Sequence, residues 1–265
     1  MDERKYSKIS NKRVCDIMKA IILAGGKGTR LAPYTMILPK PLVPLGHKPI
    51  LDIIIRQLHH YGFEDITLTL GYLAEIIQAY FLSEKDISSK ITMNYIRETK
   101  PLGTAGSLGL LKEELSDSFL VMNGDILTSL NFKKLFEYHS ENKGILTIAT
   151  HLKKVKIDLG VIVSDKSNCL TDYVEKPEKN YPVSMGIYIY KPEVLNYIKE
   201  NEYLDFPELI LRLLDNGEKV QSYPNDSFWM DIGRPEDYMQ AQKEFEEMRN
   251  FFLPGDSGYV ENPFI

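Results

Sequence analysis

Short apolar runs alternate with amphipathic segments through the first 150 residues of the chain. Residues 20–24 form an unbroken apolar run that ends in glycines, as in a strand buried on both faces. Apolar residues at 50, 53, 54, 58 and 61 recur at helical spacing, and Gly62 is placed to end that helix. Strands are then predicted at 65–70, 91–96, 119–122 and 145–150, alternating with helices near 73–82, 104–115 and 132–142. This alternation predicts a parallel sheet flanked by helices.

After residue 150 the pattern becomes richer in strands. Segments 160–163, 170–175 and 185–190 predict a smaller β-rich lobe, followed by helices at 207–216 and 235–249. Asp205 and Pro207 suit the cap and the first turn of the earlier helix. We expect a polar extension (1–17), one two-lobed domain (18–250, with halves 18–150 and 151–250) and a tail (251–265) whose apolar residues dock on the core.

Composition narrows the class of protein. Hydrophobic residues make up 43% and charged residues 26%, which is enough apolar material for a core and excludes a disordered chain. The net charge of −5 offers no general attraction to nucleic acid, so a bound phosphate needs a local cationic site. Two distant cysteines and the absence of a signal sequence or of about 20 consecutive apolar residues favour a cytoplasmic protein with no membrane contact.

The first strand leads directly into a cationic glycine turn. Its glycines let the backbone approach a ligand and direct N–H groups at an anion, while Lys27 and Arg30 add positive charge. The turn lacks the ending of a Walker loop and the third glycine of a dinucleotide fingerprint. A purely structural turn is the alternative. The candidate nucleotide-binding residues here are Leu23, Ala24, Gly25, Gly26, Lys27, Gly28 and Thr29.

Two further groups suit a phosphate-handling site. Lys40 stands between two prolines, which restrict its backbone and lower the entropy cost of holding the ammonium group in place; a solvent-exposed loop lysine is the alternative. Asp125 follows Asn123 and Gly124 at the end of a central strand, and Asp231 ends another strand. Two aspartates at neighbouring strand ends are a plausible Mg²⁺ clamp for a nucleoside triphosphate, although Asn-Gly-Asp also forms turns.

The chain resembles the sugar-1-phosphate nucleotidyltransferases. The resemblance runs from residue 18 to about 245 and rests on the ordered motifs AGGKGTRL, PKPLVP, KPI, PLGTAGSL, NGD, VEKP, MGIY and DIGRPEDY. It implies a Rossmann-like α/β fold with a sugar-binding lobe. It also implies a Mg²⁺-dependent reaction in which a sugar 1-phosphate attacks the α-phosphorus of a nucleoside triphosphate and releases pyrophosphate.

The resemblance also implies roles for the matching residues. Arg30 would bind the β- and γ-phosphates, and Lys40 would stabilise charge on the transferred phosphoryl group. Asp125 and Asp231 would hold Mg²⁺. The segment Pro101, Leu102, Gly103 and Thr104 would contact the nucleotide, Lys176 the sugar phosphate, and Gly160, Glu175 and Gly186 the hexose.

Glu98 bears on the choice of base. Uridylyl- and thymidylyltransferases of this family usually carry glutamine here, whereas a carboxylate suits the two N–H donors of guanine. GTP is therefore the first expectation, unless Glu98 faces solvent. The motif PLGTAGSL also resembles that of mannose-1-phosphate guanylyltransferases and related enzymes that make GDP-hexoses and GDP-heptoses, which makes mannose 1-phosphate the first candidate sugar. A UTP- or dTTP-dependent glucose-1-phosphate enzyme and a non-catalytic NDP-sugar-binding subunit remain alternatives. The sequence leaves a homo-oligomer open.

Overall fold

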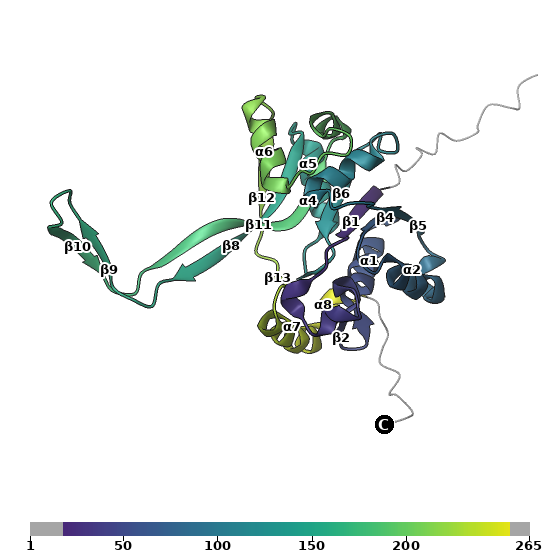
Figure 1. The fold of residues 1–265 in the computed structure, drawn as a ribbon, viewed down its shortest axis with the longest axis horizontal. Helices are drawn as coiled ribbons and strands as arrows, with labels where there is room; N and C mark the ends of the chain where they lie inside the picture. Colours follow the sequence, from purple (N-terminus) through teal and green to yellow (C-terminus); the bar gives the residue numbers. More distant parts are fainter. Residues whose placement is uncertain (1–17, 255–265) are drawn as a thin grey trace, which may run out of the picture.

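The structure, a computed structural model, describes residues 18–254 and is built on one seven-stranded sheet (Figure 1). Its strands, in spatial order, are β12 (Val220–Pro224), β8 (Leu146–Lys156), β11 (Glu178–Tyr190), β6 (Phe119–Asn123), β1 (Met18–Ala24), β4 (Phe63–Leu70) and β5 (Thr92–Arg97). Strand β11 is antiparallel to both of its neighbours, and the remaining adjacent pairs are parallel. The predicted mostly parallel α/β sheet is confirmed.

Helices cover both faces of this sheet. Ala20 and Ile22 of β1 belong to one buried cluster, and Ile21, on the opposite face, belongs to another. One cluster is closed by α1 (Ile50–His60), α2 (Ala74–Ser83), α5 (Phe132–Glu141) and α7 (Pro235–Glu247). The other is closed by α4 (Gly103–Gly106), a 3₁₀ turn (Ser107–Leu111), a second 3₁₀ turn (Pro192–Tyr197) and α6 (Phe206–Asp215). Burial on both faces explains the unbroken apolar run of β1.

The helix expected at 104–115 is much shorter in the structure. Three glycines between 103 and 109 weaken helix propensity there. The backbone N–H groups of Ala105 and Gly106 instead donate to the Leu204 carbonyl, at 2.9 and 3.0 Å. Tertiary hydrogen bonds therefore replace a regular helix in this segment.

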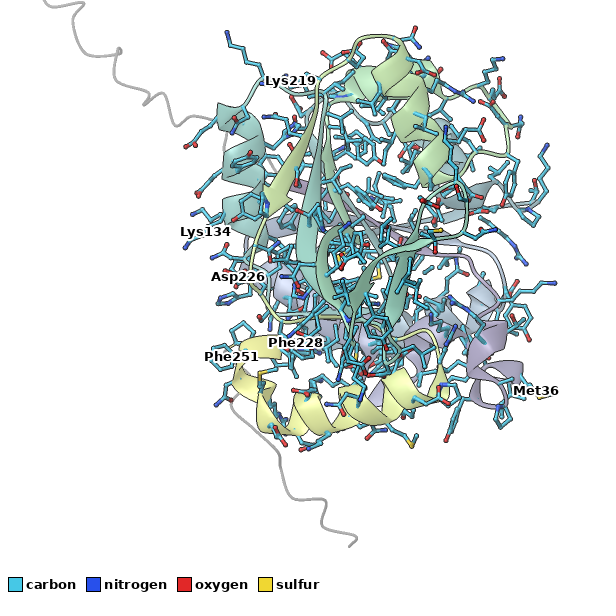
Figure 2. All side chains as sticks on the ribbon, turned by 90° about the vertical axis from the view of Figure 1, so that its left-hand side faces the viewer. Met36, Lys134, Lys219, Asp226, Phe228 and Phe251 are labelled. Carbon is cyan, nitrogen blue, oxygen red and sulfur yellow. The ribbon has the colours of Figure 1, made fainter. Side chains whose placement is uncertain are left out.

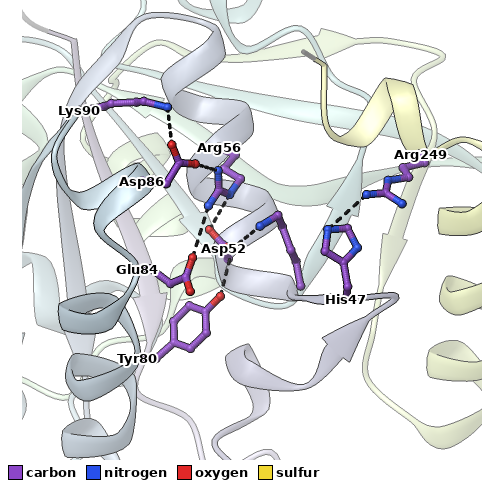
Figure 3. Close-up of polar contacts among 9 residues, drawn as sticks. His47, Asp52, Arg56, Tyr80, Glu84, Asp86, Lys90 and Arg249 are labelled. Atoms are coloured by element: carbon purple, nitrogen blue, oxygen red, sulfur yellow. Dashed lines mark hydrogen bonds and ion pairs between the residues drawn. The ribbon is translucent and has the colours of Figure 1, made fainter. Parts of the chain in front are cut away.

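A network of charged side chains centred on buried Asp52 joins α1 to its neighbours (Figure 3). Asp52, fully buried in the first turn of α1, accepts from Arg56 Nε at 2.9 Å and from the Tyr80 hydroxyl at 3.1 Å. Arg56 also reaches Asp86 on α3 (Lys85–Ser88) at 2.6 Å, and its guanidinium helps to lower the pKa of Asp86 to about 2. This network fixes α1 against α2 and α3 at the edge of the sheet.

Residues 151–184 leave the body of the molecule as a projecting arm (Figure 1). The outer halves of β8 and β11 form its stem, and β9 (Val161–Ser164) and β10 (Leu170–Val174) form an antiparallel pair at its end. Two of the three segments predicted for a small β-rich lobe, 160–163 and 170–175, thus form a short antiparallel sheet, whereas 185–190 belongs to β11 of the central sheet. The short sheet lies at the end of the arm, which is exposed along most of its length.

The C-terminal tail docks on the core in part. Phe252, on α8 (Arg249–Phe252), and Leu253 are buried, and the Phe252 ring stacks on Phe245 at a centroid distance of 6.0 Å. Phe251 stays at the surface (Figure 2). The expected N-terminal extension (1–17), Cys15 and Phe264 lie outside the described residues. No helix within residues 18–254 is long and apolar enough to cross a membrane.

Candidate active site

A cavity of about 710 Å³ lies at the carboxyl ends of β1, β4 and β6. Ligands of open α/β sheets bind at this edge. Of the predicted nucleotide-site and charged residues, the cavity is lined by Leu23, Ala24, Gly25, Gly26, Lys27, Gly28, Thr29, Arg30, Lys40, Glu98, Pro101, Gly103, Thr104, Asn123, Gly124 and Asp125. Leu102 does not line it; its side chain is buried beneath, and its backbone N–H points at Glu98.

The glycine turn after β1 forms one wall of the cavity. Gly28 has a φ of +60°, and a Cβ there would lie 2.8 Å from Cβ of Lys40, so glycine is required for both reasons. The Gly28 carbonyl accepts from the Thr35 hydroxyl at 2.8 Å. The next residues form a 3₁₀ turn (Thr29–Leu31) in which buried Leu31 holds the turn while Arg30 lines the cavity.

Lys40 is held rigidly against this turn. It begins a 3₁₀ turn (Lys40–Leu42) directly after Pro39, and the Val43 N–H closes that turn on the Lys40 carbonyl at 3.1 Å. The side chain is buried, and its Nζ forms an ion pair with Oδ2 of Asp125. The alternative of a solvent-exposed loop lysine is therefore wrong.

The two aspartates come together through a second small sheet. Strand β7 (Ile126–Thr128) pairs with β13 (Trp229–Asp231), and the Ile232 N–H donates to the Asp125 carbonyl at 3.0 Å. Partial burial, then the Asp125 carboxylate, raises the pKa of Asp231, while Lys40 and Arg30 oppose the shift. Four charged side chains thus share one electrostatic site, although Asp231 does not line the cavity itself.

The residues present fit Mg²⁺. Oδ1 of Asp125 is buried and has no hydrogen-bond partner within residues 18–254, so one charged oxygen is left available to a cation. No cluster of three or more His, Cys, Asp or Glu suited to a metal occurs among the described residues. Mg²⁺ needs no such cage, because one or two carboxylates with water and phosphate oxygens satisfy it.

The Glu98 side chain lies directly beside Gly25 of the glycine turn. Its Oε2 accepts from the Leu102 N–H at 3.2 Å, and a Cβ on Gly25 would lie 3.1 Å from its Oε1. Burial raises the pKa of Glu98, and the hydrogen bond from Leu102 opposes that shift. Since Glu98 lines the cavity, the interpretation that it merely faces solvent is wrong.

Sequence reasoning missed several lining residues. Gly71 and Tyr72 follow β4 at the same sheet edge, a position that could have signalled them. Asp205 carried no such signal: its Oδ1 accepts from the Thr104 N–H at 3.1 Å across 101 residues, and it makes no side-chain bond to cap α6, where a cap was expected. The other missed residues are Pro41, Thr69, Thr99, Lys100, Ser107 and Tyr203.

The four residues expected to bind the sugar phosphate are separated in the structure. Gly186 lies beside the cavity, where a Cβ would be 2.8 Å from Nδ2 of Asn123. Gly160, Glu175 and Lys176 lie on the arm and do not line the cavity. There the Tyr173 hydroxyl donates to Oε2 of Glu175 at 2.8 Å, and a Cβ on Gly160 would sit 2.0 Å from that hydroxyl.

Comparisons with known proteins agree with this geometry. The chain is 33% identical to a UTP–glucose-1-phosphate uridylyltransferase of Synechocystis sp. over 90% of its length, and 36% identical to a probable mannose-1-phosphate guanylyltransferase 1 of Oryza sativa subsp. japonica over 84%. It spans 66% and 63% of those relatives' lengths.

One solved structure resembles most of this chain. The crystal structure of HddC from Yersinia pseudotuberculosis has a TM-score of 0.67 and 30% identity, covering 86% of this chain and 99% of that one. The same protein has been solved in complex with GMP-PN, with a TM-score of 0.66 and 28% identity over 86% of this chain and 99% of that one. Residues 19–248 match the Nucleotidyl transferase family. With its glycine turn, lysine and paired aspartates at one sheet edge, the chain belongs to that nucleotidyl transferase family.

Proposed function

We propose that the protein transfers a nucleotidyl group from a nucleoside triphosphate to a sugar 1-phosphate. The observation that carries this proposal is the shared site of Lys40, Asp125 and Asp231 beside the glycine turn. Such a site offers backbone N–H groups and cations to a triphosphate and carboxylates to a divalent ion. That combination suits phosphoryl-group chemistry.

The reaction follows from this arrangement. An oxygen of the sugar phosphate attacks the α-phosphorus, a new P–O bond forms, and the bond from the α-phosphorus to the bridging oxygen breaks so that pyrophosphate leaves. Lys27 and Arg30 hold the β- and γ-phosphates, and Lys40 neutralises charge that develops on the α-phosphoryl oxygens. Asp125 and Asp231 would hold Mg²⁺, which supplies further neutralisation of the phosphates.

The carboxylate of Glu98 favours GTP. Guanine presents the donors N1–H and N2–H₂, and a carboxylate accepts from both. The raised pKa of Glu98 reflects a partly buried carboxylate, in which an unpaired charge is costly. Leu102 supplies one donor to Oε2, and a guanine edge would supply the remaining ones.

Of the two alternatives, one has specific support from the comparisons. A UTP- or dTTP-dependent glucose-1-phosphate enzyme is favoured by the similarity to the Synechocystis uridylyltransferase. A non-catalytic NDP-sugar-binding subunit keeps the fold without the chemistry. The charges needed for phosphate handling (Arg30, Lys40, Asp125, Lys176 and Asp231) are all present here, which favours an active enzyme.

A matrix of nucleotides against sugar phosphates tests the proposal. GTP, UTP, dTTP, ATP and CTP would each be incubated with mannose, glucose, glucosamine and heptose 1-phosphates and Mg²⁺, with pyrophosphate release and product mass recorded. We expect the highest kcat/KM for GTP, with mannose 1-phosphate as the first candidate sugar. Turnover with UTP or dTTP alone would instead support the glucose-1-phosphate uridylyl- or thymidylyltransferase. Binding of NDP-sugars without any turnover would support the non-catalytic subunit.

A further inference from the structure

Two residues in the wall of the cavity carry hydroxyl groups without a hydrogen-bond partner. Ser107 and Thr69 both line the cavity, although Ser107 is 0% and Thr69 1% exposed. Neither hydroxyl oxygen has a hydrogen-bond partner within residues 18–254. Buried hydroxyls are nearly always paired, because an unpaired one costs free energy. Two unpaired hydroxyls in one cavity therefore point to a ligand that pairs with them.

The helical turn that carries Ser107 presents this residue to the cavity. Gly103, Thr104 and Ser107 are three or four residues apart, so they lie on one side of the turn, and all three line the cavity. Ala105 and Leu108 belong to the buried apolar cluster on that face of the sheet. Ser107 is thus a polar residue on the cavity side of a turn whose other side is apolar.

Thr69 lies on the face of the sheet that this turn covers. In the parallel register, Thr69 of β4 pairs with Leu23 of β1 and with Ile96 of β5. Both neighbours pack against the apolar cluster that α4 and the following 3₁₀ turn close, so the three side chains share that face. Ser107 therefore borders the cavity from the helical turn, and Thr69 borders it from the sheet.

Glu98 belongs to the same part of the cavity. Its N–H donates to the carbonyl of Leu70, the residue after Thr69, at 2.9 Å, and its carboxylate lies beside Gly25. A carboxylate only accepts hydrogen bonds, whereas a hydroxyl can also donate one. This part of the cavity therefore offers the acceptor oxygens of Glu98 together with two unused hydroxyl donors.

Guanine has the complementary set of groups. Its N1–H and N2–H₂ are donors, and its O6 and N7 are acceptors. O6 stands next to N1–H, so a carboxylate that accepts from N1–H also lies close to an acceptor oxygen, which needs a donor of its own. Glu98 alone can pair with only half of these groups. A pyrimidine base has no counterpart of N7.

We propose that the hydroxyls of Ser107 and Thr69 donate hydrogen bonds to O6 and N7 of guanine, and so select the base together with Glu98. Binding of the base gives each hydroxyl the partner that it lacks in the free protein. A site with such groups discriminates against a ligand that leaves them unpaired. This inference rests on the proposed function, because the guanine nucleotide is the substrate proposed there.

Removing one hydroxyl at a time tests this role. Ser107→Ala and Thr69→Val remove the hydroxyl with little other change. Thr67→Val is the matched control, because Thr67 is buried on the same strand but does not line the cavity. Binding of GTP and UTP would be measured by calorimetric titration with Mg²⁺ and without a sugar phosphate. We expect the Kd for GTP to rise about 3- to 10-fold in each of the first two variants, with a smaller change for UTP and none in the control.

Two analogues of GTP identify the atoms that the hydroxyls contact. 7-Deaza-GTP has C–H in place of N7, and 6-thio-GTP has a weakly accepting sulfur in place of O6. The wild type should bind both more weakly than GTP, and each hydroxyl variant should lose its discrimination against one of them. Variants that keep the wild-type Kd for GTP, or that bind all four nucleotides equally more weakly, overturn the proposal. A wild type that binds UTP as tightly as GTP overturns it as well.

The stability of the variants separates this role from a structural one. Because neither hydroxyl has a partner in the free protein, its removal should not lower the free energy of unfolding, measured with denaturant. A fall larger than that of Thr67→Val would mean that the hydroxyl bonds within the protein, which overturns the proposal. Guanine-selective binding without transfer to any sugar phosphate would reject the proposed function and leave this inference standing.

Discussion

The two carboxylate oxygens of Asp125 lie in different environments, and that difference explains how one residue can serve both Lys40 and a cation. Oδ2 pairs with Lys40, while buried Oδ1 has no hydrogen-bond partner within residues 18–254. An unsatisfied buried polar atom costs about 1–3 kcal/mol, and more when charged. A cation at Oδ1 would remove that cost.

Replacing Asp125 by asparagine should remove the charge with little change of shape. We expect kcat to fall at least ~100-fold, because a fixed charge at the reacting phosphates contributes several kcal/mol to transition-state stabilisation. Pyrophosphate release would be measured as a function of Mg²⁺ concentration. Exposed Asp117→Asn is the matched control and should behave as wild type. Unchanged turnover by Asp125→Asn would refute the metal role.

Replacing Glu98 by glutamine should alter base preference. A hydrogen bond to a charged group contributes about 1.5–3 kcal/mol, so kcat/KM for GTP should fall roughly 10- to 150-fold while that for UTP changes less. The raised pKa of Glu98 also means that its carboxylate is protonated at a higher pH than an ordinary glutamate. GTP turnover by the wild type should therefore decline earlier on acidification than turnover by Glu98→Gln. Parallel profiles for the two proteins would contradict this role.

Packing between helices and strands determines the contacts of several polar side chains that belong to no recognised sequence motif. His139 on α5 is buried, with its Nδ1 2.8 Å from the Thr147 hydroxyl of β8. Asp205, at the start of α6, binds both Thr104 and Tyr203 and so ties α6 to α4. Such contacts join helices and strands that are separated by many residues in the chain.

The buried His139 should make stability depend on pH. Burial, aided by Lys191, lowers its pKa to about 4, whereas the unfolded chain has a pKa near 6.5. Between these values the unfolded state binds more protons, so stability is full above pH 6.5 and is lost as the pH falls toward 4. From pH 7 to pH 5 we expect a loss of about 2 kcal/mol from this group. The free energy of unfolding, measured with denaturant at both pH values, should fall less in His139→Gln than in the wild type. An equal fall in the two proteins would argue against a role for His139.

Removing the Asp205 side chain should loosen the contact between α6 and α4. Asp205→Ala removes the acceptor of two exposed hydrogen bonds, from the Thr104 N–H and the Tyr203 hydroxyl, and should cost about 1 kcal/mol of stability. Because both residues line the cavity, we also expect a higher KM for the nucleotide. Denaturant unfolding and steady-state kinetics would test this, with exposed Asp215→Ala on the same helix as control. Equal effects of the two variants would rule out a special role for Asp205.

At the scale of the whole molecule, the predicted nucleotide-binding residues lie together at one edge of the sheet. Glu175 and Lys176, predicted to bind the sugar phosphate, lie away from that edge on the arm. β1, β5 and β6 end at one edge of the sheet, so Gly28, Glu98 and Asp125, which follow these strands, line one cavity although they are distant in sequence. The arm carries Glu175 and Lys176 out from that edge (Figure 1).

Local sequence patterns were sufficient to predict the alternating strands and helices, the glycine turn and the rigid position of Lys40. Unbroken apolar runs, a left-handed Gly28 and flanking prolines each act within a few residues, so their effect can be read from neighbouring positions. The motif match extended this to the roles expected of Asp125 and Asp231, which the antiparallel pairing of β7 with β13 brings together.

Long-range packing set the remaining features. The shortened helix at 103–111, the Asp205–Thr104 contact and the course of the arm depend on groups about 100 residues apart or on register at the end of the sheet. No local propensity encodes them, because hydrogen bonds across the fold outweigh the small preferences of individual residues. The sequence therefore contains the chemical groups of the site, while packing across the sheet determines which of them share a cavity.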